Sequence, residues 1–109
     1  MAQARELLIT ARAGEPDTDR MEVVLVERDT SPWGTMSVQL TQDWQQIRVP
    51  LSEFRAYGHW TTEAKDRGGP EDRLHPERIL WVNFCFGSWL YPGSFAHPHA
   101  IEIQDVSLK

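Results

Sequence analysis

The sequence predicts an all-β fold, an antiparallel β-sandwich, on two observations. Six segments of the 109-residue chain have the alternating or β-branched pattern of strands, and turn residues separate most of them. No stretch has the 3.6-residue periodicity of a long amphipathic helix. Because 109 residues suit one domain with one core, we expect residues 1–109 to form a single sandwich.

The expected strands cover residues 5–13, 21–28, 35–41, 44–51, 78–87 and 100–108. The last of them changes phase, because Ile101 and Ile103 share one parity while Val106 and Leu108 share the other. A bulge near Gln104 would return all four apolar side chains to one face. Turn residues predict loops at 14–19, 28–34 and 91–94, and LSEFR (51–55) could form one helical turn with Ser52 as a weak cap.

The strand at 78–87 has two contrasting faces. One parity holds the apolar side chains of Leu80, Val82, Phe84 and Phe86, which we expect in the core. The other parity holds Ile79, Trp81, Asn83 and Cys85, so a tryptophan and an amide lie where a plain polar row would be expected. Cys85 is the single cysteine, which excludes an intramolecular disulfide, and we expect it to be an inert packing residue.

Several function classes are disfavoured by composition and motifs. The net charge of −5 argues against nucleic acid and other polyanions as partners. No apolar run approaches the roughly 20 residues of a membrane-spanning helix, and the first residues lack a signal-peptide pattern. The chain has no nucleophile motif, no phosphate loop and no carboxylate pair at catalytic spacing, so we do not expect an enzyme. His97 and His99 have a metal-like spacing, but we expect ordinary loop histidines.

Five stretches resemble a known family: RELLITARA, MEVVLVERD, TQDWQQIRVPLSEF, LHPERILWVNFCFG and HAIEIQDVSL. Over about residues 5–108 the chain resembles the C-terminal two thirds of the galactose-binding-like jelly roll, the fold of many carbohydrate-binding modules attached to glycoside hydrolases. Trp44 to Phe54 match the family pattern W-x-x-I-x-V-P-L-x-x-F at every fixed position. The resemblance implies a structural role for Trp44, an extracellular setting in a secreted enzyme, and binding of an oligosaccharide or polysaccharide.

Two departures from that family matter. Its modules begin with some forty or more residues, including two or three strands, that have no counterpart here. We therefore expect an incomplete sandwich, completed by a second copy of the chain or by a partner domain. The family also uses an aspartate near Asp105 for a structural calcium ion. Gln104 replaces the first aspartate of its closing motif, so calcium is the one cofactor that the resemblance implies, with Asp105 as the candidate ligand.

Sugar binding needs an aromatic ring against the C–H face of a pyranose and planar polar groups for adjacent hydroxyls. Trp81 and Asn83 fit this need, and Gln46 and Arg48 repeat the pattern, so the four would line one platform if their strands share a sheet. Loop aromatics are the second candidate set, with Trp60, Trp89 and Tyr91 as ligand-binding residues and Trp33 and Tyr57 beside them.

Two alternatives to sugar binding stay open. The first is a structural or interaction module that packs on a catalytic domain or partner chain, in which case Trp81 is covered by protein. The second is a small enzyme or lyase-like fragment, which needs carboxylates or histidines clustered by folding. The long connection at 56–77 is either functional or an ordinary solvated loop.

Overall fold

The computed structural model describes residues 4–57, 69, 72–86, 90–91 and 99–109, apart from the side chains of Met36 and Ser37. The described strands, all paired antiparallel, are β1 (Glu6–Ala13), β2 (Arg20–Glu27), β3 (Pro32–Gln39), β4 (Gln45–Pro50), β5 (Arg55–Ala56), β6 (Ile79–Cys85) and β7 (Ile101–Leu108). Two short 3-10 turns, η1 (Leu51–Glu53) and η2 (Pro76–Arg78), are the helical elements of these ranges. None of the described helical turns has the length or apolarity needed to cross a lipid bilayer.

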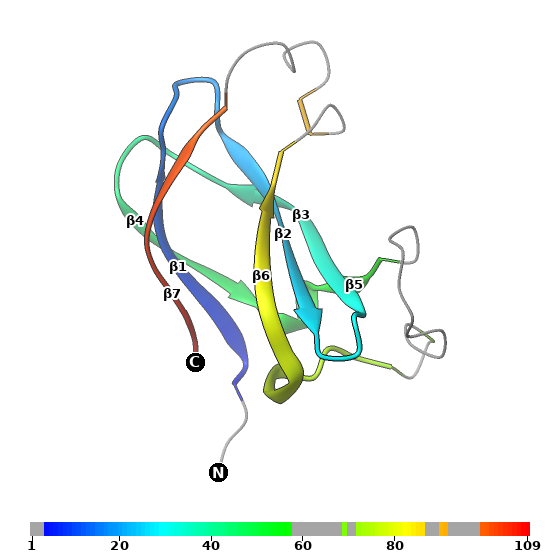
Figure 1. Cartoon of the computed structure of the whole chain (residues 1–109). Coiled ribbons are helices and arrows are strands. Elements are labelled where there is room, and N and C mark those ends of the chain that lie inside the picture. The colour runs from blue at the N-terminus through cyan, green and yellow to red at the C-terminus, as the bar shows by residue number, and fades with distance from the viewer. Residues whose placement is uncertain (1–3, 58–68, 70–71, 87–89, 92–98) are drawn as a thin grey trace.

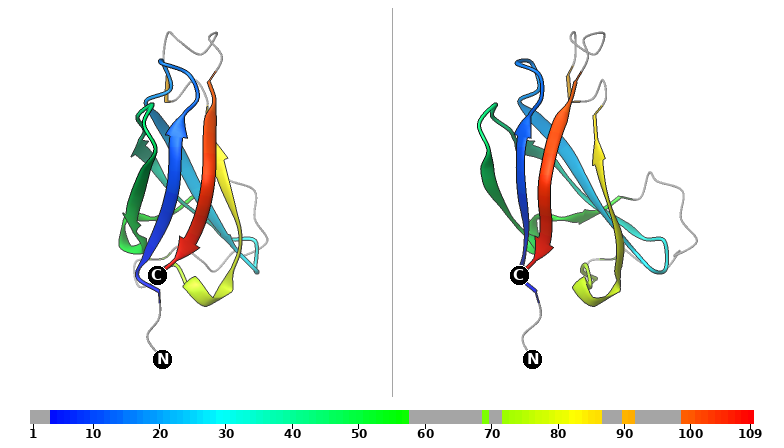
Figure 2. Two further views of the ribbon diagram at one scale, coloured as in Figure 1. Left: turned by 90° about the vertical axis from the view of Figure 1, so that its left-hand side faces the viewer. Right: turned by 60° about the vertical axis from the view of Figure 1, so that its left-hand side comes forward.

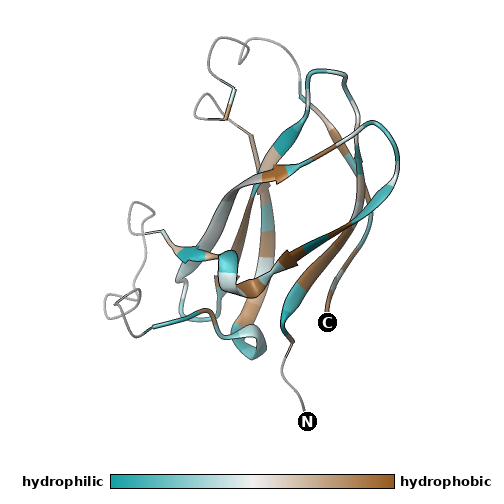
Figure 3. Ribbon diagram, turned by 180° about the vertical axis from the view of Figure 1, so that it is seen from behind, coloured by the Kyte–Doolittle hydropathy of each residue, from teal (hydrophilic) through white to brown (hydrophobic). Residues whose placement is uncertain are grey.

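The strands form two sheets that pack face to face, which confirms the predicted antiparallel β-sandwich (Figure 1). A three-stranded sheet has the order β4-β1-β7, and a four-stranded sheet has the order β5-β3-β2-β6. The strands carry most of the apolar residues, while the turns that join β1 to β2 and β3 to β4 are hydrophilic (Figure 3). Each sheet has an inner face toward the interior of the sandwich and an outer face away from it.

The core lies where the two central strands face each other. Leu7, Ile9 and Ala11 of β1 alternate inward, and Val23 and Leu25 of β2 meet them, and all five are at most 1% exposed. Alternation with a period of two places such residues on one face of each strand. Both central strands are covered on each side by neighbours, which explains why their inner residues are fully removed from water.

The bulge predicted in the last strand is confirmed. Thr10 pairs with Asp105 and the next residue, Ala11, pairs with Ile103, so Gln104 is the extra residue of β7. The shift puts all four apolar side chains of β7 opposite the buried residues of β1, on the inner face of the sheet; the pairs are Ala13–Ile101, Ala11–Ile103, Ile9–Val106 and Leu7–Leu108.

A second bulge lies in β6 and was not predicted. Val26 pairs with Trp81 whereas Glu27 pairs with Ile79, so Leu80 is skipped in the ladder. As a result Ile79 packs against the core, and Leu80 is 54% exposed. The prediction that Leu80 is a core residue was wrong because parity counting assumes an unbroken strand.

Strand β3 begins earlier than predicted. It starts at Pro32, inside the expected loop 28–34, and Trp33 is a core residue with its Nε1 donating to Ser31 Oγ at 3.2 Å. The helical turn expected after Pro50 is present as η1, without a side-chain cap from Ser52. Strand β5, only two residues long, was not predicted.

The two sides of the sandwich differ. On one side the edge strands are β4 and β5, and the chain itself crosses between the sheets there through η1, with Leu51 and Phe54 buried. On the other side the edge strands are β6 and β7, one from each sheet (Figures 1 and 2). On this side Ile103 and Leu108 are 37% and 38% exposed, although both project from the inner face.

Candidate functional site

Trp81 and Asn83 lie together on the outer face of the four-stranded sheet. Trp81 is paired with Val26 and Asn83 with Val24, so the two side chains project two residues apart from the edge strand β6. The Trp81 ring is 44% exposed, and Val24 and Val26 behind this row are 0% and 4% exposed. A half-exposed aromatic residue thus lies beside an amide, on a face whose neighbouring strand is buried at Val24 and Val26.

The ring of Tyr57 covers part of this outer face. It lies directly on Gly34 of β3, where an added Cβ would come within 2.3 Å of Tyr57 Cζ. Tyr57 packs with Val24 and Val26 into a second apolar cluster, which Cys85 joins from β6. Gly34 is therefore needed for its lack of a side chain, because any Cβ would occupy the place of the ring.

A buried carboxylate completes that cluster. Glu22 is 4% exposed, and the hydroxyl of Tyr57 donates to its Oε2 at 3.0 Å. Burial, together with the nearby Glu22 carboxylate, raises the pKa of the Tyr57 hydroxyl and of the Cys85 thiol above their ordinary values. A thiol with a raised pKa stays protonated near neutral pH.

Gln46 and Arg48 do not join Trp81 and Asn83. Both belong to β4, at the far edge of the three-stranded sheet, and their partners across the ladder are Thr10 and Leu8. There Arg48 Nη1 binds Glu6 Oε1 at 2.5 Å, and Nη2 donates to Gln46 Oε1 at 3.5 Å. The condition for a four-residue platform, that the two strands share a sheet, is therefore not met.

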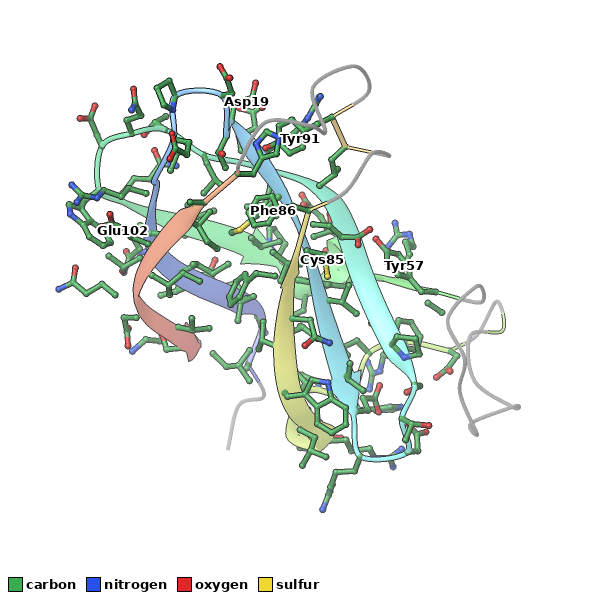
Figure 4. The ribbon with its side chains drawn as sticks, turned by 45° about the horizontal axis from the view of Figure 1, so that its top comes forward. Asp19, Tyr57, Cys85, Phe86, Tyr91 and Glu102 are labelled. Carbon is green, nitrogen blue, oxygen red and sulfur yellow. The ribbon has the colours of Figure 1, made fainter. Side chains whose placement is uncertain are left out.

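Tyr91 is a structural residue and offers no exposed ring. It is 3% exposed, its hydroxyl donates to the backbone oxygen of Arg20, and the Arg20 N–H donates back to it at 2.9 Å. Its ring stacks on His99 at 3.9 Å between centroids and lies beside Phe86 (Figure 4). The prediction of Tyr91 as a sugar-binding ring was wrong, because the ring ties the β6–β7 connection to the start of β2.

The other predicted aromatic and metal-binding residues have varied outcomes. Trp60, Trp89 and His97 lie outside the described residues, and His99 Nδ1 is 3.0 Å from Thr18 Oγ1. Trp44, expected as a packing residue, is 45% exposed with the Arg12 guanidinium 4.9 Å from its ring centroid.

The described surroundings of Asp105 do not form a calcium site. It is exposed on β7 and pairs with Thr10 in the ladder. Within the described ranges no group of three or more His, Cys, Asp or Glu side chains could hold a metal ion. Because Ca²⁺ takes six to eight oxygen ligands, these residues do not fit it.

One cavity, of about 970 Å³, was not anticipated from the sequence. It lies between the start of β1, the η1–β5 region and the segment before η2, with an apolar floor that includes Trp33, Phe54 and Leu74 and with Arg5 and Arg55 among its polar lining. Its lining residues come from separate stretches of the chain, so no spacing in the sequence marks them. Glu22 and Gly34 were missed for the same reason.

Comparisons with known proteins give no assignment: no family model, no curated protein and no solved structure matches this chain.

Proposed function

We propose that this chain is a non-catalytic carbohydrate-binding module, which holds a neutral glycan on the outer face of the four-stranded sheet. The observation that carries the proposal is the pairing of a half-exposed Trp81 with Asn83 on the same face of β6. The setting we propose with it is an extracellular one, as one part of a secreted carbohydrate-active enzyme.

The chemistry of the face supports a sugar. A tryptophan ring offers the flat apolar surface that the C–H face of a pyranose needs, and an amide supplies a donor and an acceptor for adjacent hydroxyls. Trp81 and Asn83 are two residues apart, so their Cα atoms are separated by about 7 Å, a distance comparable to the width of one sugar ring. With one described ring, the expected binding is shallow and weak.

The packing around Trp81 and Asn83 also supports the proposal. Val24 and Val26, which neighbour Asn83 and Trp81, are almost fully buried, and Tyr57 is fixed over Gly34 by its bond to Glu22. Because the residues next to Trp81 and Asn83 are already packed, less of this face has to be ordered when a ligand binds. The net charge of −5 favours a neutral glycan over an acidic one.

The test uses Trp81→Ala and a closely matched control. Trp44 is equally exposed, at 45% against 44%, but lies next to β4 of the other sheet, so Trp44→Ala removes the same kind of surface elsewhere. Both variants and the unaltered protein are titrated by calorimetry, and by affinity electrophoresis in gels that contain neutral polysaccharides such as xylan, β-glucan and mannan. We expect one of these to bind the unaltered protein and Trp44→Ala, and Trp81→Ala to lose at least about 10-fold in affinity.

Amide variants give a second comparison. Asn83→Ala should weaken the same binding, while Gln46→Ala on the opposite sheet should leave it unchanged. No binding to any polysaccharide, or equal loss in Trp81→Ala and Trp44→Ala with both proteins folded by circular dichroism, would refute the proposal.

A further inference from the structure

The open side of the sandwich, between β6 and β7, has the features of a docking surface for a β-strand. In the described part of the chain β7 pairs only with β1, and β6 only with β2. Each therefore has one edge without a ladder partner in these ranges. Such edges are templates for pairing with another chain unless something covers or disrupts them.

The apolar side chains at these edges are incompletely buried. Ile101 and Val106 are half-buried, and Ile103 and Leu108 are 37% and 38% exposed, although their partners in β1 are fully enclosed. Val82 and Phe84 of β6, and Phe86 directly after it, pack against the core but are only partly covered. A row of core-facing residues that stays open to water on both edge strands is a feature of interaction surfaces.

The bulge at Gln104 makes this row continuous along β7. Without it, Val106 and Leu108 would project from the outer face, and an added strand would meet only half of the apolar residues on its inner side. With it, all four point the same way. Strand addition combines main-chain hydrogen bonds with pockets for alternate side chains, so a continuous row suits it.

The charges on β7 indicate which kind of strand would pair with its free edge. Its outer face carries Glu102 and Asp105, of which Glu102 is paired with Arg12 at 2.8 Å. A second copy added antiparallel in the register that pairs Ile101 with Val106 would place Glu102 of each copy against Asp105 of the other. Like charges directly opposite are destabilising, and each copy has a net charge of −5. Basic side chains would face the same acids favourably.

We propose that the β6–β7 side of the sandwich takes up an amphipathic β-strand of a partner. This strand adds to the free edge of β7, with apolar side chains against Ile101, Ile103, Val106 and Leu108 and with Lys or Arg beside Glu102 and Asp105. It completes the sandwich on the side that the described chain leaves open. The inference is independent of the glycan proposal, because Trp81 and Asn83 project from the outer face of the other sheet.

The experiment uses the 109-residue protein with two synthetic nine-residue peptides. Both alternate valine with a charged residue, which is lysine in one and glutamate in the other. Binding is followed by NMR of the ¹⁵N-labelled protein. We expect the lysine peptide to bind saturably, with shifts concentrated in β7 and β6, and roughly 10-fold more tightly than the glutamate peptide, because two cross-strand pairs change from repulsive to attractive.

Matched variants separate the apolar and the charged contributions. Ile103→Lys should weaken the lysine peptide at least about 10-fold, whereas Gln46→Lys, the same gain of charge on the far edge strand, should have little effect. If Ile103→Lys does not fold, the double variant Glu102→Gln with Asp105→Asn gives the answer. The double variant should bind the lysine and glutamate peptides equally. Asp43→Asn in the β3–β4 turn, a control that removes a charge elsewhere, should keep the preference for the lysine peptide.

Four results would overturn the proposal. The first is equal binding of both peptides, the second is no shift in β7 or β6 at saturation, and the third is a preference that survives the double variant. A dimer of the unmodified protein in sedimentation that dissociates in Ile103→Lys would also overturn it, since a second copy would then occupy the surface.

Discussion

Replacing Gly34 with alanine tests the close approach of Tyr57 to β3. The new Cβ would lie 2.3, 2.5 and 2.7 Å from Cζ, Cε2 and Oη of Tyr57, all far inside van der Waals contact. The ring cannot stay, and the strand beneath it is held by β2 on one side and β5 on the other. We therefore expect the tyrosine to leave its place on Gly34.

The size of the effect follows from what the ring loses. A hydrogen bond to a charged group is worth about 1.5–3 kcal/mol, and Tyr57 Oη makes one to the buried Glu22. A buried aromatic ring covers about 150–250 Å², and at about 25 cal/mol per Å² the loss of a third of that contributes about 1.5 kcal/mol. Gly34→Ala should therefore lower the free energy of unfolding by about 3–4 kcal/mol.

The assay is a double-mutant cycle in urea, followed by far-UV circular dichroism. In the background of Tyr57→Ala the clash is gone, so Gly34→Ala should cost under about 1 kcal/mol, or stabilise slightly because alanine is preferred to glycine inside a strand. The coupling between the two positions should reach about 3 kcal/mol. A cost for Gly34→Ala that is equal in both backgrounds would refute this account of the contact.

Three further predictions concern stability. Tyr91→Phe should cost about 2 kcal/mol in urea unfolding, since two backbone groups of Arg20 lose their partner, and an unchanged midpoint would contradict this. The free energy of unfolding should fall as pH rises above about 8.5 and again above about 10, because Cys85 and Tyr57 keep their protons in the folded state after the unfolded chain has lost them. A profile flat from pH 7 to 10.5 would be inconsistent with those raised pKa values. Thr30→Asn should raise the free energy of unfolding by about 0.5–1 kcal/mol, because Thr30 has a φ of 70°, which asparagine adopts more readily. A lower melting temperature of this variant would contradict the expectation of strain at this turn.

The sequence predicted correctly those features that depend on the residue pattern within one strand. The alternation of apolar residues predicted six of the seven described strands, and the phase change at Gln104 predicted the bulge, because both depend only on the period of two. The same logic failed at Leu80, where nothing in the spacing signals the skipped residue. It also missed β5, which is too short to show a pattern.

The candidate site depended on facts that no single strand contains. Gln46 and Arg48 have the same local pattern as Trp81 and Asn83, yet the order of strands sends them to another sheet. Tyr91 looked like a loop aromatic until its bonds to Arg20, 71 residues away, placed it in the interior. Contacts between distant segments are set by topology, and one sequence without its fold does not report them.

The pairing of β1 with β7 has a consequence for the order of folding. β1 is the central strand of its sheet, yet its register with β7 joins Leu7 to Leu108, so nearly the whole chain must be looped to close it. Closing such a loop costs conformational entropy before any stabilising contact between the two strands has formed. Sheets that pair strands distant in sequence therefore fold slowly. During synthesis β1 is made before β7, and β4 is its other partner among the described strands. We therefore expect the three-stranded sheet to be the last part of the domain to become protected in pulsed hydrogen exchange.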